Sequence, residues 1–243
     1  MKTRSALIVV IVLGLAVRAQ ADYVYNAHSE FNSTSNTASD TWQYMTAATF
    51  GTNGGYTLMP STLYGATEIS TVQGWGIDDA WTAPYLADWT VSGEPDIKPA
   101  GLYFDLELAG GAATTPSGVL AWRSPTSGYA TVDFTLTGGP TAVANATGTG
   151  DGMTYALFAG SEATARATGV ATGAAAATEH VAYIPVSAGT MLYLQFGSGA
   201  NSYGDDYRCD YTIAVSDVPE PSSIVLLGST LVGLLAYAWR KRK

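Results

Sequence analysis

The 243-residue chain carries a formal net charge of −9 and contains only one cysteine. The negative charge argues against a nucleic acid as an electrostatic partner, and one cysteine leaves no pair for an internal disulfide. With 47% hydrophobic residues, the chain is apolar enough to bury a core.

The N-terminus predicts a signal peptide. A positively charged start precedes the apolar run Ala6 to Val17, which is too short to span a bilayer comfortably. Ala19 and Ala21 then form a small-x-small cleavage site for signal peptidase. We therefore expect residues 1–21 to be removed and the mature protein to be exported.

The segment that remains, residues 22–217, is strongly acidic. The segment contains four Lys and Arg residues and 19 Asp and Glu residues, which gives it a formal net charge of −15. Such a charge disfavours an anionic polysaccharide as a partner, whereas cations and neutral sugars remain compatible with it. We expect one domain, because the segment shows neither a clear boundary nor a repeat.

Alternation of apolar and polar residues dominates residues 22–217. In the run Ala130 to Thr137 every second residue is apolar, the pattern of a strand with one buried face. Comparable short runs cover 102–108, 119–122, 154–158, 180–186, 191–196 and 208–215. The pattern predicts an all-β fold, an antiparallel β-sandwich, with Cys209 as a small buried side chain.

Two regions are less regular. Residues 159–178 are mostly Ala, Thr and Gly, and they predict either a long loop or an exposed edge hairpin. The first 75 residues of the domain are richer in Asn, Ser, Thr and Trp, and we expect them to form edge strands and long loops over one face.

Aromatic side chains form the first candidate site. Sugar rings have apolar faces that stack on exposed Trp or Tyr rings. The densest cluster of aromatic and acidic residues outside the predicted strands comprises Trp75, Asp78, Asp79, Trp81 and Trp89. Either these rings form a glycan-binding platform on a loop, or they fill the sandwich core.

Carboxylates form the second candidate site. Asp205, Asp206 and Asp210 cluster at the entry to the last predicted strand. Hard oxygen ligands on a turn suit Ca²⁺, whereas the alternative is a solvated acidic turn. No cofactor other than this possible structural calcium is expected.

Catalysis has little support in the sequence. The chain contains no G-x-S-x-G, H-E-x-x-H or phosphate-loop motif. Its two histidines lie far apart along the chain, which disfavours a catalytic triad. A glycosidase needs only two facing carboxylates, so a polysaccharide hydrolase stays an alternative, but we expect the protein not to be an enzyme.

The last 26 residues combine three signals. A Val218-Pro219-Glu220-Pro221 motif precedes an uncharged span, residues 222–239, and a basic tail, residues 240–243. The span is long enough to cross a bilayer as one transmembrane helix, and the positive-inside rule keeps the tail cytoplasmic. Residues 22–217 would then lie outside the cytoplasm.

Residues 218–243 resemble the PEP-CTERM sorting signal of exported bacterial proteins. The resemblance implies that an exosortase-type membrane protease cuts near the motif, with Pro219, Glu220 and Pro221 as recognition residues. It also implies a Gram-negative host that makes exopolysaccharide.

A second resemblance lies within the domain. The segment Trp122-Arg123-Ser124-Pro125-Thr126-Ser127-Gly128 and the strand that follows resemble a turn of jelly-roll domains often found before PEP-CTERM signals. Such domains are similar to carbohydrate-binding modules, so the resemblance implies a jelly-roll-like sandwich.

Taken together, the sequence predicts an exported cell-surface or exopolysaccharide-matrix protein without catalysis of its own. The expected activity is binding of a neutral extracellular polysaccharide. A purely structural matrix protein is the main alternative and a polysaccharide hydrolase the second.

Overall fold

The structure is a computed structural model that describes residues 23–66, 70–79, 82, 84–91, 101–106, 116–138, 151–173, 176–202, 205–216, 230, 233–234 and 237–241. Two compact units are present. Residues 23–215 form one unit, which contains the whole hydrophobic core of the described chain. The other unit comprises residues 1–22 and 216–243, and the predicted signal peptide lies outside the described residues.

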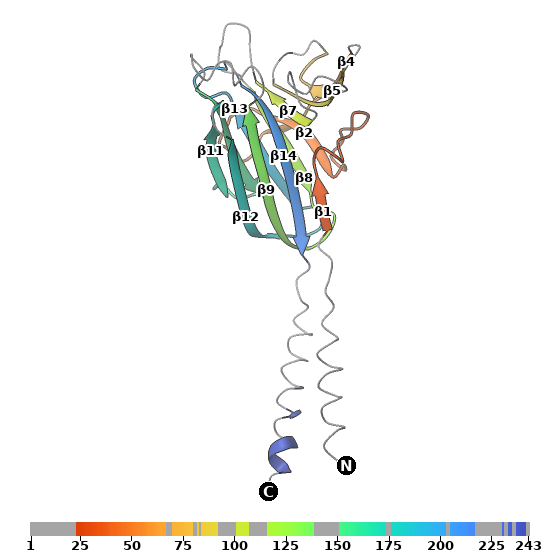
Figure 1. The fold of residues 1–243 in the computed structure, drawn as a ribbon, viewed down its shortest axis with the longest axis vertical. Helices are drawn as coiled ribbons and strands as arrows, with labels where there is room; N and C mark the ends of the chain where they lie inside the picture. Colours follow the sequence, from red (N-terminus) through yellow and green to blue (C-terminus); the bar gives the residue numbers. More distant parts are fainter. Residues whose placement is uncertain are drawn as a thin grey trace. The chain divides into compact units, whose positions relative to one another are not determined.

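Fourteen strands make up the described part of the larger unit (Figure 1). Their bounds are β1 Tyr23–Asn26, β2 Trp42–Ala47, β3 Tyr56–Leu58, β4 Ser61–Ala66, β5 Ser70–Gly76, β6 Tyr85–Val91, β7 Gly101–Asp105, β8 Ser117–Arg123, β9 Gly128–Gly138, β10 Met153–Ala159, β11 Ala167–Ala171, β12 Ala177–Val186, β13 Met191–Gly197 and β14 Asp206–Ser216.

The strands form two sheets. The first has the order β12-β9-β14-β7-β6-β5-β4, with β1 also paired to β14, and the second has the order β11-β10-β13-β8-β2-β3. The described strand pairs with a defined register are antiparallel. From β8 to β14 the chain crosses repeatedly between the sheets, as in double-sheet jelly rolls.

Aromatic rings hold the two sheets together. Phe104 of β7 meets Phe196 of β13 at a centroid distance of 3.6 Å, and Trp42 of β2 meets Tyr211 of β14 at 5.5 Å. Phe134 of β9 likewise packs edge-on against Tyr155 of β10. These contacts join opposite sheets, so the alternating runs bury their apolar faces against one another. The predicted antiparallel β-sandwich is confirmed.

Each alternating run of the sequence lies within or overlaps a strand. Strand β9 shows the clearest agreement, with Ala130, Val132, Phe134 and Leu136 buried and the residues between them partly or fully exposed. Cys209 is a free, fully buried cysteine, as predicted. Of the two alternatives for residues 159–178, the edge hairpin is correct, because β11 pairs with β10 at the end of its sheet.

The start of the domain contributes more sheet than expected. Six strands, β1 to β6, precede residue 92, and β4, β5 and β6 extend the first sheet by three consecutive antiparallel strands. Low regularity in the sequence hid these strands, because several of their residues, such as Gly65, Gly74 and Gly76, are glycines.

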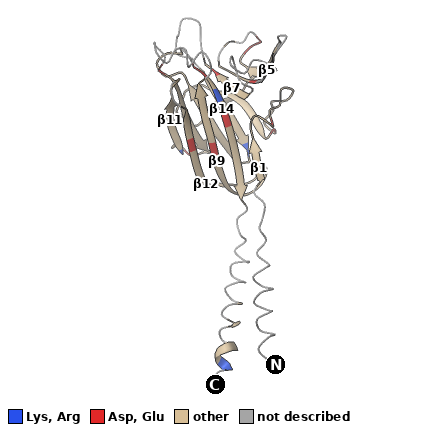
Figure 2. Ribbon diagram, in the orientation of Figure 1, with Lys and Arg blue, Asp and Glu red and all other residues tan. Residues whose placement is uncertain are grey.

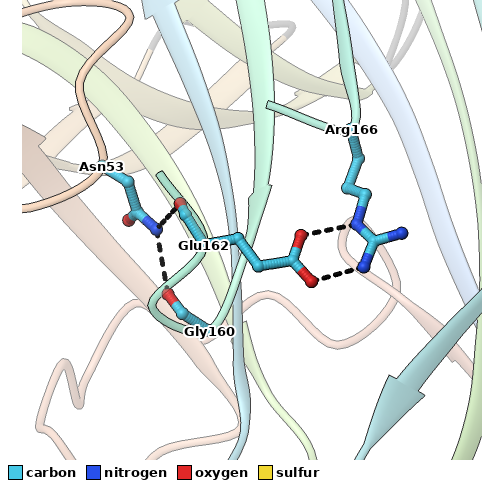
Figure 3. Close-up of polar contacts among 4 residues, drawn as sticks. All are labelled: Asn53, Gly160, Glu162 and Arg166. Atoms are coloured by element: carbon cyan, nitrogen blue, oxygen red, sulfur yellow. Dashed lines mark hydrogen bonds and ion pairs between the residues drawn. The ribbon is translucent and has the colours of Figure 1, made fainter. Parts of the chain in front are cut away.

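The loop between β2 and β3 crosses the second sheet. Gly51 donates its amide to Gln195 Oε1 of β13 at 2.9 Å. The Asn53 side chain donates to the carbonyls of Gly160 and Glu162 at 3.0 and 2.7 Å (Figure 3). Glu162 also pairs with Arg166, which fixes the turn between β10 and β11. The loop is therefore held against this sheet through Gly51 and Asn53 and covers part of its face.

Trp75 of β5 is a core residue. Its side chain is 6% exposed, and its ring stacks on Tyr44 with an interplanar angle of 8° and a centroid distance of 6.2 Å. The indole N–H donates to the Asn32 carbonyl at 2.8 Å. Trp75 thus anchors the segment between β1 and β2 to the core.

We expect Trp75→Ala to lower the free energy of unfolding by about 3–5 kcal/mol, because a large buried ring is replaced by a cavity. Chemical denaturation of residues 22–217 measures this change. Tyr64→Ala is the matched control, since Tyr64 lies on the adjacent strand β4 and is 66% exposed. Equal stability of the two variants would contradict the placement of Trp75 in the core.

Candidate functional site

The structure does not assemble the aromatic and acidic cluster as an exposed platform around Trp75. Of the two alternatives, Trp75 follows the core one. Asp79 is exposed, and Asp78 accepts a hydrogen bond from the Thr82 amide at 3.2 Å. Trp81 and the side chain of Trp89 lie outside the described residues, so their proposed contact with glycan stays a prediction.

The three carboxylates at the start of β14 point to different environments. Asp205 and Asp206 are buried, at 0% and 4% exposure, whereas Asp210 is half exposed and pairs with Arg208 at 2.7 Å. The described chain contains no group of three or more His, Cys, Asp or Glu side chains that could hold a metal ion. Calcium binding by Asp205, Asp206 and Asp210 therefore stays a prediction.

Asp105 and Asp206 are two described carboxylates that adjacent strands place opposite each other. They are cross-strand partners on β7 and β14, and Tyr85 donates its hydroxyl to Asp105 Oδ2 at 2.6 Å. The neighbouring Tyr103 is also buried, and burial raises its pKa to about 12, with the Asp206 carboxylate adding to the shift. A sugar could not reach the buried Asp206 in this structure, so the pair does not favour hydrolysis.

A different surface carries Tyr129 and Tyr183, two of the exposed aromatic residues. It is the outer face of β12, β9, β14 and β1, the side of the first sheet that points away from the second sheet (Figure 1). We call it the outer face. Outward positions on β9 alternate with the core positions, so Tyr129, Thr131 and Asp133 lie on this face.

Tyr183 is the most distinctive residue of the outer face. Its side chain is 80% exposed, and its backbone φ is 60°. Among the described residues, no other non-glycine residue has a positive φ. The register of β12 on β9 shifts between Val181 and Ile184, which marks a β-bulge. A bulky residue with positive φ is strained. The bulge therefore displays the Tyr183 ring at a cost in backbone energy.

Tyr129 lies close to this bulge. It is 40% exposed and faces Pro185 in the register of β9 and β12, two residues beyond Tyr183. Cross-strand and diagonal neighbours on one face of a sheet lie within reach of aromatic side chains. Two exposed tyrosines and an exposed proline thus share one patch.

Polar side chains continue the outer face beyond the tyrosines. His180 Nδ1 lies 2.5 Å from Asp133 Oδ1, and the Thr135 and Thr178 hydroxyls lie 3.1 Å apart. All four of these side chains are at least partly exposed. On β14 the ion pair of Arg208 and Asp210 adds a guanidinium and a carboxylate. The face therefore offers apolar ring surfaces beside hydroxyl, carboxylate and imidazole groups.

Such an arrangement can bind a sugar without reacting with it. Aromatic rings stack on the apolar faces of pyranose rings, and the polar groups can exchange hydrogen bonds with hydroxyls. Sequence reasoning missed this site because it followed tryptophans. The available signal was Val181-Ala182-Tyr183-Ile184, four apolar residues that interrupt the alternation of a predicted strand, as a bulge does.

We expect Tyr183→Gly to be more stable than Tyr183→Ala by about 1 kcal/mol, because glycine adopts a positive φ without the clash of a Cβ. Both variants remove the same ring, so thermal or chemical unfolding isolates the backbone strain. At Tyr129, where the strand is regular, we expect the order to reverse by about 0.5–1 kcal/mol in favour of alanine. The same order at both positions would refute the strain at Tyr183.

Comparison with solved structures gives distant likenesses. The C-terminal CBM6 of LamC, a marine laminarinase from Zobellia galactanivorans, is 13% identical, with 48% of this chain and 82% of that chain covered and a TM-score of 0.28. CBM27-1 of Caldicellulosiruptor saccharolyticus, solved with mannohexaose, is 16% identical, with 53% of this chain and 84% of that chain covered and a TM-score of 0.38. The xylan-binding module CBM15 is 11% identical, with 82% of this chain and 100% of that chain covered and a TM-score of 0.36. No curated protein sequence matches the chain.

The C-terminal segment gives a more specific match. Residues 217–243 match the PEP-CTERM protein-sorting motif. Within the part of the chain that the structure describes, no helix is long and apolar enough to cross a membrane. Most of residues 217–243 lie outside that part, so the predicted transmembrane helix stays a prediction. The chain carries a PEP-CTERM sorting signal, which implies an exported protein that is associated with a membrane before processing.

Proposed function

We propose that this chain is an exported, non-catalytic surface or matrix protein that binds a neutral glycan through the outer face. In this proposal signal peptidase removes residues 1–21, and residues 222–239 hold the protein in the inner membrane. An exosortase-type protease then cuts near Pro219, Glu220 and Pro221 and releases the sandwich to the cell surface or matrix. The sorting motif in residues 217–243 supports this route.

Replacement of Pro219, Glu220 and Pro221 by alanine should leave uncut protein in the membrane, because the protease then lacks its recognition residues. Immunoblots of membrane and released fractions measure this. Asp217→Ala, just outside the triplet, is the control and should be processed normally. Mass spectrometry that finds Lys243 on the mature surface protein would contradict the proposed cleavage.

Tyr183 is the observation that carries the glycan proposal. A sheet gains nothing from a strained tyrosine whose ring is 80% exposed, since glycine would fit the bulge without strain. Strained residues persist mainly where function requires them. A ring held outward beside Tyr129 and the pair of His180 and Asp133 is suited to stacking on a sugar.

The charge of the domain supports a neutral ligand. Residues 22–217 carry a formal net charge of −15, which repels uronate-rich or sulfated chains. On the outer face Asp133 and Asp210 are each 52% exposed at the side chain, but a cationic or titratable partner lies beside each. The hydroxyl groups of a neutral sugar would therefore meet carboxylates that are already paired with His180 or Arg208, and not an isolated charge.

We expect Tyr183→Gly and Tyr129→Ala to lose binding to the neutral polysaccharide of the host, while each melts within a few degrees of the parent. Pull-down of residues 22–217 on that polysaccharide, paired with a thermal melt, measures both. Tyr64→Ala is the control, because it removes an equally exposed tyrosine from β4, far along the same sheet.

Unchanged binding by Tyr183→Gly and Tyr129→Ala would refute the outer face as the site. Absence of binding by the parent domain to every neutral glycan tested would leave the purely structural matrix protein as the better account. Release of reducing ends from the polysaccharide would instead indicate the hydrolase.

A further inference from the structure

The two ends of the sandwich leave from the same place. Tyr23, the first residue of β1, pairs with Val215 near the end of β14. Ser216 ends β14 and is followed at once by the sorting motif. Five residues separate Ser216 from the predicted span 222–239. Because an extended residue covers at most about 3.6 Å, chain length alone keeps this end of the sandwich within roughly 20 Å of the membrane.

The exposed apolar side chains gather at this end. We define the terminal band as Tyr23, Val24, Tyr129, Tyr183 and Pro185. Strands β9 and β1 begin here and β12 and β14 end here (Figure 1). In the described sandwich six large hydrophobic side chains are exposed, and four of them belong to the band, at 56%, 64%, 40% and 80% exposure. Chance exposure would scatter them.

The outer face changes character along its strands. Val24 faces Ala214 in the register of β1 and β14. Both residues lie nearer to the end of β14 than Thr212, whose hydroxyl donates to the Asp133 carbonyl at 3.5 Å. In Figure 2 the acidic positions on β9, β12 and β14 lie away from the end at which β14 terminates. The two turns at this end, residues 124–127 and 187–190, contain no Asp or Glu. The exposed cation Arg123 directly precedes the first of these turns, so an otherwise acidic domain presents toward the anchored end of its chain two turns that carry no carboxylate.

Tyrosine and small apolar side chains suit one partner in that position. Tyrosine is enriched at the membrane interface, where its ring meets apolar material and its hydroxyl meets headgroups and water. We propose that the terminal band lies in the lipid interface while the chain is uncut, and that cleavage uncovers Tyr129 and Tyr183 for glycan. This inference rests on the proposed function, because the same tyrosines serve both partners in succession.

Spin labels on the full chain test the contact. The chain is reconstituted in vesicles of phosphatidylethanolamine and phosphatidylglycerol, with a label at Val24→Cys in the band or, as the matched control, at Thr178→Cys in the polar part. The native Cys209 does not compete, because it is fully buried and burial raises the pKa of its thiol well above the usual value. Digestion by added protease identifies chains whose sandwich is outside the vesicle.

We expect the label at position 24 to lose accessibility to a water-soluble relaxant and gain accessibility to oxygen in vesicles, relative to the released domain, residues 22–217. The label at position 178 should stay accessible to the water-soluble relaxant in both states. We also expect the vesicle-held chain to bind less polysaccharide than the released domain. A label at position 24 that stays equally wet in both states would overturn the inference.

The same experiment separates the two proposals. If position 24 is wet in vesicles while the released domain binds polysaccharide, the lipid contact is wrong and the glycan function stands. If position 24 is buried in lipid while the released domain binds no glycan, the proposed function is wrong and the contact stands.

Discussion

Strand β14 is the constraint on which the arrangement of this molecule depends. Its first residues pair with β7 and its last with β1, while β9 lies on its other side. The inward side chains of its second half are fully buried, and Tyr211 touches rings on both Trp42 and Phe134. Because β14 is a central strand and also the last one, the chain cannot leave the sandwich from an edge. The chain leaves the sandwich beside the start of β1. This position sets which end of the domain is nearest to the C-terminal sorting signal.

The strands near β14 could be predicted from the sequence because one physical rule governs them. A strand buried on one side needs an apolar residue at every second position, and β9 follows this rule from Ala130 to Leu136 and β14 from Tyr207 to Val215. Strands β4 to β6 could not be predicted in the same way, since glycines replace apolar residues there. At Gly74 a Cβ would lie 2.4 Å from the Leu86 carbonyl oxygen, so close approach of the neighbouring strand selects for glycine and removes the alternating signal.

The candidate site was less predictable than the fold, for two physical reasons. First, Trp75 and an exposed platform tryptophan look alike in a sequence, because both are large aromatic residues near loops; only the stacking on Tyr44 separates them. Second, Tyr183 is displayed by a register shift between β12 and β9, and register is a property of two strands. The three carboxylates at β14 also differ in a way that the sequence does not show, because Asp205 and Asp206 are buried whereas Asp210 is exposed.

The positive φ of Tyr183 also limits what kind of explanation can hold. A residue that served only the fold would be expected to become glycine there, since the left-handed conformation costs a bulky residue roughly 1–2 kcal/mol. That energy is a sizeable part of the 5–15 kcal/mol that keeps a typical domain folded. Removing the ring would also take apolar surface off the protein. The proposed contacts, with a lipid surface first and a sugar afterwards, therefore depend on a tyrosine that is both strained and 80% exposed at the anchored end of the outer face.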